Sequence, residues 1–333
     1  MATTEARYDI VAIGNAIVDV IAKADDVFLD EEQLVKGSMA LIDAQRAQEL
    51  YRDMGPAREI SGGSGANTLA GASTLGRQCA LIAQVADDQL GEVFAHDIRA
   101  TGIDFDVPPL GIEPPTARCL IFVTPDAQRT MNTFLGASQY LPAAAVDADL
   151  IASGAILYLE GYLWDAEEPK AAMTLGIDIA RENDRIVAFT LSDGFCVDRH
   201  REEFIDLIKN DKIDILFSNE AEIMSLTQIE DFDAAVNQTA TQVGTLVVTR
   251  SEKGALAVQK GKRFEVAAEP VDKIIDTTGA GDLFAAGFLS GYSENRSIDD
   301  CLTIGAIAAA EVISHYGARP EADLKKLVKQ RLG

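Results

Sequence analysis

The chain has 333 residues, 47% of them hydrophobic and 25% charged, and its 53 acidic against 29 basic residues give a formal net charge of −24. This composition predicts a soluble globular protein, and the acidic excess disfavours binding to nucleic acid or to an anionic membrane surface. No stretch reaches the roughly 18 consecutive apolar residues of a membrane span, and residues 1–8 lack a targeting pattern, so we expect a cytoplasmic protein.

Short apolar runs rich in Val, Ile and Leu alternate along the chain with segments of helical length. The runs predicted to be buried strands are 9–13, 79–85, 154–159, 185–191, 213–217 and 245–248. The segments predicted to be helices are 90–100, 169–182, 201–209, 281–291 and 298–315. Strands and helices that alternate in this way build a parallel sheet covered by helices. We therefore predict a doubly wound, mainly parallel α/β fold.

Two stretches, 17–62 and 112–135, depart from this rhythm because they alternate apolar and polar residues, and we expect no long helix in them. The alternation predicts an antiparallel β layer in which 116–124 pairs with 130–134. Both stretches leave the large sheet at the edge where open α/β sheets bind ligands. We predict that they form a small β lid domain, while 1–16, 63–111 and 136–333 form a large nucleotide-binding and catalytic domain.

The most informative motif is DTTGAGD, residues 276–282, at the start of the predicted helix 281–291. Successive amides of Gly279, Ala280 and Gly281 at a helix N-terminus can bind an anion such as a phosphoryl group in transfer. The carboxylate of Asp282 follows them and can deprotonate a substrate hydroxyl. From this string alone, a tight turn before a capped helix explains the residues equally well. The string is neither a Walker A loop nor a Rossmann fingerprint.

Residues 276–282 resemble the C-terminal signature of the ribokinase-like (PfkB) carbohydrate kinases, and SGGSGAN at 61–67 resembles their N-terminal signature. GNAIVD at 14–19, NEAE at 219–222 and VTRSEKG at 248–254 follow in the family's order and spacing, so the resemblance covers nearly the whole chain. Within the family, 14–19, 189–195 and 214–220 most resemble adenosine kinases. The resemblance implies a purine-salvage kinase that transfers the γ-phosphate of ATP to the 5′-hydroxyl of a nucleoside, giving AMP from adenosine.

The same resemblance implies a role for each matched residue. Asp282 is the expected general base and Gly279–Gly281 the anion hole, while Arg129 of the lid is expected to close on the phosphates. Polar residues are expected to bind the ribose and apolar ones to enclose the base, although most single apolar residues are also explained as core. The expected substrate-binding residues are Asn15, Ile17, Asp19, Met39, Gly62, Gly63, Ser64, Asn67, Cys119, Met131, Tyr162 and Phe195. The expected nucleotide-binding residues are Asn219, Thr249, Ser251, Gly254, Gly279 and Gly281.

ATP and Mg²⁺ are the implied cofactors, with K⁺ as a further candidate. Glu222 lies one helical turn after Asn219, where the family organises Mg²⁺ through water, and a helix cap with an early glutamate explains the pair equally well. Asp276 and Thr278 match part of the family's monovalent-cation loop. Glu321 stands where a Ser is expected, which leaves dependence on K⁺ open.

Four widely spaced cysteines without a CxxC pair predict reduced, buried thiols; they are Cys79, Cys119, Cys196 and Cys301. We expect a small-molecule substrate, no nucleic-acid or membrane partner, and a monomer or homodimer. Two alternatives stay open. One is a kinase of a free sugar, ribose or a ketohexose, which would need a polar pocket. The other is a non-catalytic nucleoside-binding protein, which would commonly lack the base or the anion-hole glycines that are present here.

Overall fold

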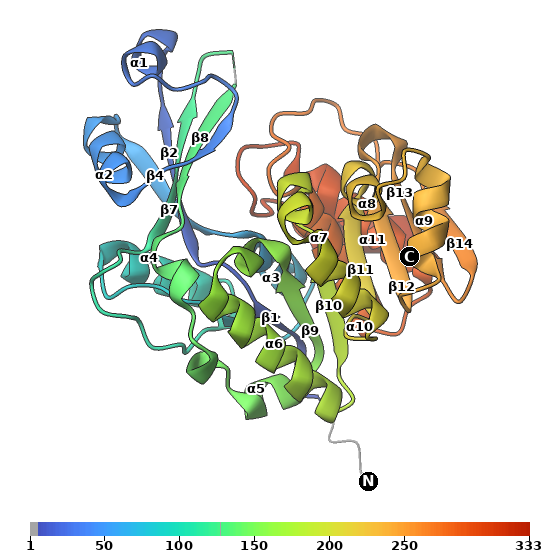
Figure 1. Ribbon diagram of the computed structural model, residues 1–333. Coiled ribbons are helices and arrows are strands. Elements are labelled where there is room, and N and C mark those ends of the chain that lie inside the picture. The colour runs from blue at the N-terminus through green and yellow to red at the C-terminus, as the bar shows by residue number, and fades with distance from the viewer. Residues whose placement is uncertain (1–5, 127) are drawn as a thin grey trace.

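The larger of two β-sheets organises the computed structural model, which describes residues 6–126 and 128–333 (Figure 1). Its strand order is β14-β13-β12-β11-β10-β9-β1-β5-β6. The parallel strands are β1 (Tyr8–Ile13), β5 (Cys79–Ile82), β6 (Ile103–Asp104), β9 (Gly154–Glu160), β10 (Ile186–Thr190), β11 (Ile215–Asn219) and β12 (Thr245–Thr249). An antiparallel hairpin of β13 (Ala255–Gln259) and β14 (Lys262–Val266) forms one edge.

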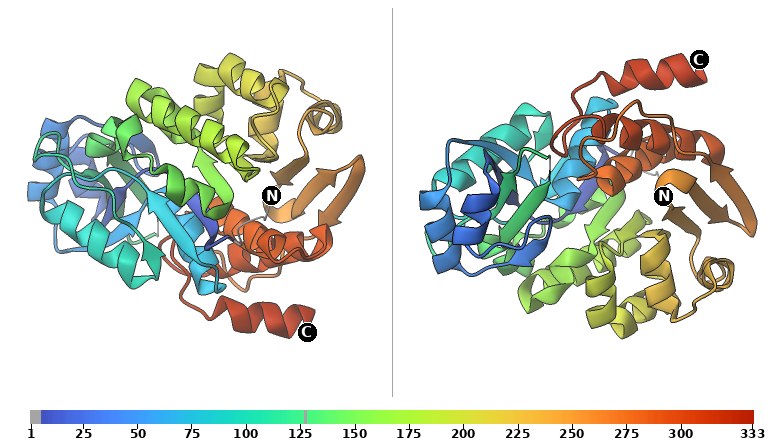
Figure 2. Two further views of the ribbon diagram at one scale, coloured as in Figure 1. Left: turned by 90° about the horizontal axis from the view of Figure 1, so that it is seen from below. Right: turned by 90° about the horizontal axis from the view of Figure 1, so that it is seen from above.

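Helices cover both faces of this sheet, as Figure 2 shows. One face carries α3 (Ser64–Thr74), α4 (Gln89–Ala100), α10 (Ala280–Ser293), α11 (Ile298–Val312) and α12 (Leu324–Leu332). The other carries α5 (Ala148–Ala152), α6 (Glu167–Glu182), α7 (Gly194–Lys209), α8 (Glu220–Thr227) and α9 (Phe232–Ala240). Along β1, Ile10 and Ala12 pack into the first core, and Val11 and Ile13 into the second. Because both faces are buried, the strands are continuously apolar, which confirms the predicted doubly wound fold.

The smaller sheet has five strands and extends from one side of the large sheet, at the upper left of Figure 1. Its order is β3 (Met39–Leu41), β8 (Arg129–Phe134), β7 (Ala117–Val123), β2 (Ile17–Lys23) and β4 (Ala57–Gly62), so every strand lies within 17–62 or 112–135. The pairing of β7 with β8 is antiparallel, as predicted. The division of the chain into two domains stays a prediction.

Two details of the smaller sheet differ from the prediction. The layer is mixed, because β2 pairs in parallel with β7, and β3 with β8. The stretch without an expected long helix contains α1 (Asp26–Glu31) and the ten-residue α2 (Ala44–Asp53). Helix α2 is capped by Asp43 and buries Ala47 and Leu50, three residues apart on one face. This spacing of i and i+3 is helical, and the sequence prediction interpreted it as strand alternation.

The parallel strands end at one edge of the large sheet, and four of their last residues line a single cleft there. These are Glu160 of β9, Thr190 of β10, Asn219 of β11 and Thr249 of β12. The smaller sheet begins at the same edge, because only three residues separate the end of β1 from the start of β2. The fold therefore brings the two sheets together at the position where open α/β sheets bind ligands.

The structure also bears on the cysteines and on membrane-spanning helices. The four cysteines are buried and free, as predicted. No helix among residues 6–126 and 128–333 has the length and apolar character needed to cross a membrane.

Candidate active site

A cleft of about 850 Å³ lies between the smaller sheet and the carboxyl ends of the parallel strands. The predicted site residues that line it are Asn15, Ile17, Asp19, Met39, Gly63, Ser64, Asn67, Cys119, Met131, Tyr162, Phe195, Asn219, Glu222, Thr249, Ser251, Thr278, Gly279, Ala280, Gly281 and Asp282. Four others lie outside the lining, namely Gly62, Arg129, Gly254 and Asp276. Residues separated by more than 200 positions in the sequence thus meet in one cleft.

Helix α10 begins at this cleft with Gly279 as its N-cap. The φ of Gly279 is 76°, in the left-handed region that favours glycine, and an added Cβ would lie 2.6 Å from Cβ of Ala318. The cap makes no side-chain hydrogen bond to the first turn, and an added Cβ at Gly281 would meet nothing within 4 Å. The backbone amides of the first turn therefore lie next to open space. An anion bound at a helix N-terminus needs this arrangement.

The carboxylate of Asp282 is held from the opposite side by α3. Ser64 Oγ donates to Oδ1 at 2.6 Å, and Asn67 Nδ2 donates to Oδ2 at 2.9 Å. Burial raises the pKa of Asp282, while the hydrogen bonds from Ser64 and Asn67 and the charge of Arg319 lower it. The arrangement can orient a carboxylate as a proton acceptor beside the amide turn.

Asp19 of β2 brings a second carboxylate to the cleft. An added Cβ at Gly62, on the paired strand β4, would lie 2.7 Å from Oδ2 of Asp19, so only glycine leaves room for this side chain. Burial raises the pKa of Asp19 to about 6, and the charges of Arg129 and Arg319 oppose the rise. Gly62 therefore acts on the site through Asp19 without lining the cleft itself.

Glu160, at the end of β9, is a cleft residue that the sequence prediction missed. Its fully buried carboxylate accepts hydrogen bonds from the backbone N of Asn15 at 2.8 Å and of Gly65 at 2.5 Å, and from the side-chain amide of Asn15. Burial raises the pKa of Glu160 to about 7. An added Cβ at Gly14 would lie 2.9 Å from Oε2 of Glu160. Glu160 thus joins the turn after β1 to the first turn of α3, and the signal in the sequence was an acidic residue at the end of an apolar run.

Apolar side chains of β3, of α7 and of the segment after β9 form another part of the cleft wall. Phe195 is 74% exposed and Met39 50% exposed, although both line the cleft. Tyr162 is held in place by a hydrogen bond from its hydroxyl to the backbone O of Ser192 at 3.2 Å. Large apolar side chains exposed in a concave site, instead of packed in the core, are typical of a ligand-binding surface.

Asn219 and Glu222 form a capping box at the start of α8. The side chain of Asn219 accepts from the backbone N of Glu222 at 2.8 Å, and Glu222 accepts from the backbone N of Asn219 at 2.9 Å. Burial raises the pKa of Glu222 to about 7. Both residues also line the cleft, so the cap itself contributes a carboxylate to the site.

Gly254 differs from the other nucleotide-binding candidates because it does not line the cleft. Its φ is 85°, and an added Cβ would lie 2.0 Å from the backbone O of Val266. Gly254 lies between β12 and β13, where this close approach allows the chain to turn back. Thr249 and Ser251, just before it, remain at the cleft.

Glu222 is the candidate residue for a Mg²⁺ site in the cleft. Residues 6–126 and 128–333 contain no group of three or more His, Cys, Asp or Glu that could hold a metal. Both carboxylate oxygens of Glu222 already accept hydrogen bonds from Asn219, and the side chain lines the cleft, so Glu222 would fit Mg²⁺ through a bound water.

Asp276 already has protein partners for its charge. Its carboxylate accepts from the backbone N of Thr278 at 3.0 Å and of Gly317 at 2.9 Å, and it forms an ion pair with Arg129. Arg129 also donates to the hydroxyl of Thr278 at 3.0 Å. The residues do not fit K⁺ at this carboxylate while the guanidinium is in place. Arg129, predicted over the phosphates, here reaches from the smaller sheet to the loop before α10.

Comparisons with known proteins agree with this geometry. The model of the pfkB family carbohydrate kinases matches residues 8–324. The crystal structure of adenosine kinase from Sinorhizobium meliloti is 48% identical, with a TM-score of 0.91, and the match covers 98% of this chain and all of that one. A probable sugar kinase from Rhizobium etli CFN 42 is also 48% identical with a TM-score of 0.91, and the match covers 98% of this chain and 99% of that chain. Adenosine kinase of Dictyostelium discoideum is 25% identical over 340 residues, with 96% of this chain and 98% of that protein covered.

The family match spans both sheets and the whole cleft. Nucleoside and sugar kinases of this kind are phosphotransferases with an alcohol group as acceptor, which agrees with a carboxylate beside an amide turn in the cleft. The chain therefore belongs to the pfkB family of carbohydrate kinases.

Proposed function

We propose that this kinase transfers the γ-phosphate of ATP to the 5′-hydroxyl of a nucleoside, with adenosine as the main acceptor and AMP as the product. The position of Asp282 carries the proposal. Its two oxygens are oriented by Ser64 and Asn67, and its backbone belongs to the same helix turn as Gly279–Gly281. A hydroxyl placed against Asp282 would thus lie next to a site for the phosphoryl group.

The cleft wall supports a nucleoside over a free sugar. Asn15, Asp19 and Asn67 offer amide and carboxylate groups, which suit the vicinal hydroxyls of a ribose. The cleft also presents apolar side chains, among them Phe195 and Met39, which are exposed. A free sugar would leave these side chains in water, whereas a purine would cover them.

The proposed transfer is an in-line displacement. The substrate 5′-oxygen bonds to the γ-phosphorus as its proton passes to Asp282, and the bond from that phosphorus to the β,γ-bridging oxygen breaks. The amides of Gly279–Gly281 stabilise the charge on the phosphoryl oxygens. Thr249, Ser251 and Asn219 hold the nucleotide. Mg²⁺, when bound near Glu222, supplies positive charge to the phosphates.

The smaller sheet acts as a lid over the acceptor in this proposal. Residues 17–62 and 112–135 carry Ile17, Asp19 and Met39 to one side of the cleft. A lid that closes over these residues excludes water, which would otherwise accept the phosphoryl group. Arg129 lies at the start of β8 within the lid, and its ion pair with Asp276 joins the lid to the loop before α10.

A panel of acceptors tests the proposal. The purified protein is incubated with Mg·ATP and, separately, with adenosine, other nucleosides, ribose and a ketohexose, and the phosphorylated carbon is identified by NMR. We expect adenosine to give the highest kcat/KM, with phosphate on the 5′-oxygen. Ribose phosphorylated as well as adenosine would favour a sugar kinase, and no turnover of any acceptor would favour a binding protein.

A further inference from the structure

Arg319 is a charged residue near the cleft to which neither a motif nor the proposed transfer gives a role. It lies in the loop between α11 and α12, and its half-buried guanidinium donates four hydrogen bonds to one short segment. Nε and Nη2 donate to the backbone O of Ser61 at 3.1 and 2.8 Å, Nη2 also donates to Oγ of Ser61 at 3.0 Å, and Nη1 donates to the backbone O of Ala66 at 2.6 Å. The planar guanidinium thus joins the end of β4 to the first turn of α3.

The segment held in this way carries the partners of Asp282. Ser64 and Asn67, which donate to the two oxygens of Asp282, lie between or next to the positions that Arg319 binds. Ser61 is also fixed from the other side, because its backbone N and Oγ donate to Asp97 of α4 at 2.8 and 2.6 Å. A shift of Ser61 or Ala66 would therefore move the donors that orient the base.

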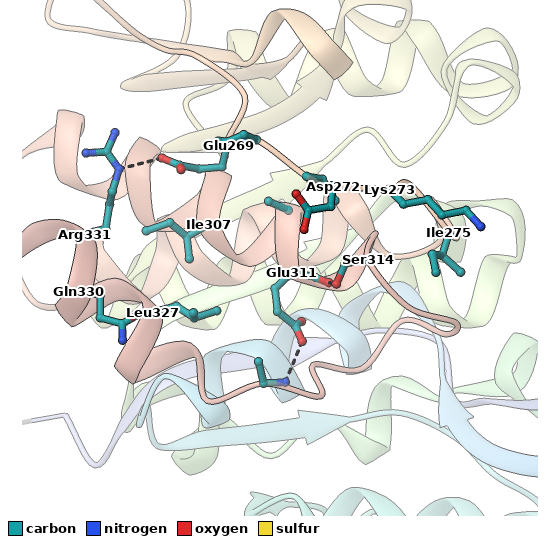
Figure 3. Close-up of a pocket in the computed structure, with 14 residues that line it drawn as sticks. Glu269, Asp272, Lys273, Ile275, Ile307, Glu311, Ser314, Leu327, Gln330 and Arg331 are labelled. Atoms are coloured by element: carbon teal, nitrogen blue, oxygen red, sulfur yellow. Dashed lines mark hydrogen bonds and ion pairs between the residues drawn. The ribbon is translucent and has the colours of Figure 1, made fainter.

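The loop that carries Arg319 is itself anchored at both ends. Gly317 donates its backbone N to Asp276 at 2.9 Å. On the other side, Oε1 of the buried Glu311 accepts from the backbone N of Glu321 at 2.9 Å and of Ala322 at 2.8 Å. Figure 3 shows the side chain of Glu311 in a pocket lined by α11, α12 and the chain from Glu269 to Ile275. Arg319 is therefore presented by a fixed loop, and its position is not set by its own side chain alone.

All three acceptor atoms of Arg319 are neutral, so its charge is not balanced by a contacting carboxylate and acts on carboxylates farther away. Burial lowers the pKa of Arg319 to about 10, and the charges of Asp97, Asp19 and Asp282 oppose this fall, so the group stays positive at neutral pH. Asp282 is faced by titratable groups from several elements, and the charge of Arg319 lowers its pKa. The negative charge of Asp282 in turn raises the pKa values of four neighbouring groups, namely Asp19 of β2, Tyr158 and Glu160 of β9, and Tyr162.

We propose that Arg319 is a positioning residue for phosphoryl transfer, which holds the segment Ser61–Asn67 in register with Asp282 and supplies positive charge to Asp282 and Asp19. The guanidinium contacts neither the acceptor nor the phosphates in this account. It acts through Ser64 and Asn67, whose donors set the direction of the base, and through its positive charge, which opposes the rise in the pKa of Asp282 caused by burial. The proposal deepens the proposed function and rests on it.

Two substitutions separate the two parts of this role. R319M removes the charge and the hydrogen bonds, and we expect kcat for adenosine to fall about 10²-fold, as for a misplaced catalytic group. Because a nearby cation is lost, the acid limb of the kcat profile should also move to higher pH, by about one unit. R319K keeps the charge but cannot bond Ser61 and Ala66 together, so kcat should fall while the acid limb stays in place.

The matched control is R181M. Arg181 of α6 also makes a two-pronged contact, to Asp214 at 3.0 and 2.9 Å, but Asp214 precedes β11 at the edge of the sheet opposite the cleft. This variant should lose stability with the kinetic pH profile unchanged. In a D282A background, R319M should cause no further loss of kcat, because the two residues act in one pathway.

Turnover of adenosine by the wild type is measured in the same assay and tests the proposed function by itself. A wild type inactive on every acceptor would contradict the kinase proposal. Folded R319M with wild-type kcat, or with a reduced kcat and an unmoved acid limb, would overturn the role of Arg319 alone. If R319M does not fold, kcat of R319K tests the proposal instead. A wild-type kcat in R319K would overturn the positioning role.

Discussion

Ser64 of α3 donates its hydroxyl to Oδ1 of Asp282 of α10 at 2.6 Å, although the two residues are 218 positions apart. The contact joins the two signature segments of the chain, since Ser64 lies in SGGSGAN and Asp282 ends DTTGAGD. It gives the two segments a shared task, which is to orient one carboxylate beside the first turn of α10. Substitutions at some distance from Asp282 should therefore change the reaction in ways that depend on which contact they disturb.

The substitution G62A should weaken acceptor binding through Asp19. The new Cβ would lie 2.7 Å from Oδ2 of Asp19 and displace that carboxylate. We expect KM for adenosine to rise about tenfold or more, because a displaced polar group loses its hydrogen bonds to the acceptor. G55A is the matched control, since an added Cβ at Gly55 meets nothing within 4 Å. Steady-state kinetics measure KM for adenosine in the two variants. Equal KM values in G62A and G55A would contradict a role for Asp19 in binding.

The substitution G281A should impair the phosphoryl site without disturbing the fold. An added Cβ at Gly281 meets no protein atom within 4 Å, so the free energy of unfolding should stay close to that of the wild type. The same methyl group would occupy space beside the first-turn amides, and we expect kcat to fall about 10²-fold. Urea unfolding and steady-state kinetics measure the two quantities. G111A is the control, because an added Cβ at Gly111 also meets nothing within 4 Å. A wild-type kcat in G281A would argue against an anion site at this turn.

Stability should fall as the pH rises from about 5 to 7. Burial raises the pKa of Asp19 to about 6 and those of Glu160 and Glu222 to about 7, above their values of 3.8 and 4.5 in the unfolded chain. A group with a raised folded-state pKa contributes stability below the unfolded value, and this contribution is lost as pH rises through the folded value. Each group should lower the free energy of unfolding by about 1 kcal/mol across this window.

Urea unfolding at pH 5.5 and 7.5 measures this dependence. The carboxyl of Asp126, whose pKa is lowered to about 2 by Lys36, is ionised in both states over this range and does not offset the trend. E160Q should reduce the difference between the two pH values because it removes one of the three groups. A wild type that is more stable at pH 7.5 would show that these carboxylates are not responsible for the pH dependence.

The sequence was most informative where local pattern determines structure. The continuous apolar strands predicted a parallel sheet, and the glycines and Asp282 identified the start of α10, because period and turn chemistry are local properties. Helix α2 was missed because the helical spacing of Ala47 and Leu50 was interpreted as part of the alternation expected over 17–62. The parallel pairing of β2 with β7 joins segments about 100 residues apart, and no local signal specifies such a partner.

The sequence prediction missed Glu160 and Arg319. These two residues differ in how well the sequence alone could have identified them. Glu160 follows an apolar strand directly, and an acidic residue at that position is a recognisable signal. Arg319 contacts Ser61 across 258 residues, and in its own loop it resembles any exposed arginine. Its role depends on the tertiary arrangement of β4, α3 and α10. Tertiary contacts of this kind are visible only in the folded structure.

Activity should not depend on K⁺. Arg129 already balances the charge of Asp276, and the amides of Thr278 and Gly317 also donate to its carboxylate. Turnover of adenosine measured at one ionic strength in potassium chloride and in sodium chloride should be equal. Activation specific to K⁺ would mean that Arg129 leaves Asp276 in the active state and that a cation replaces it.

The rate of AMP formation by D282A tests the central claim most directly. The account predicts that kcat falls by roughly 10² to 10⁴, as expected for the loss of a general base, while adenosine still binds, as measured by calorimetry, because Asp19 and the apolar wall remain. Turnover within tenfold of the wild type in a folded D282A protein would contradict the assignment of Asp282 as the base.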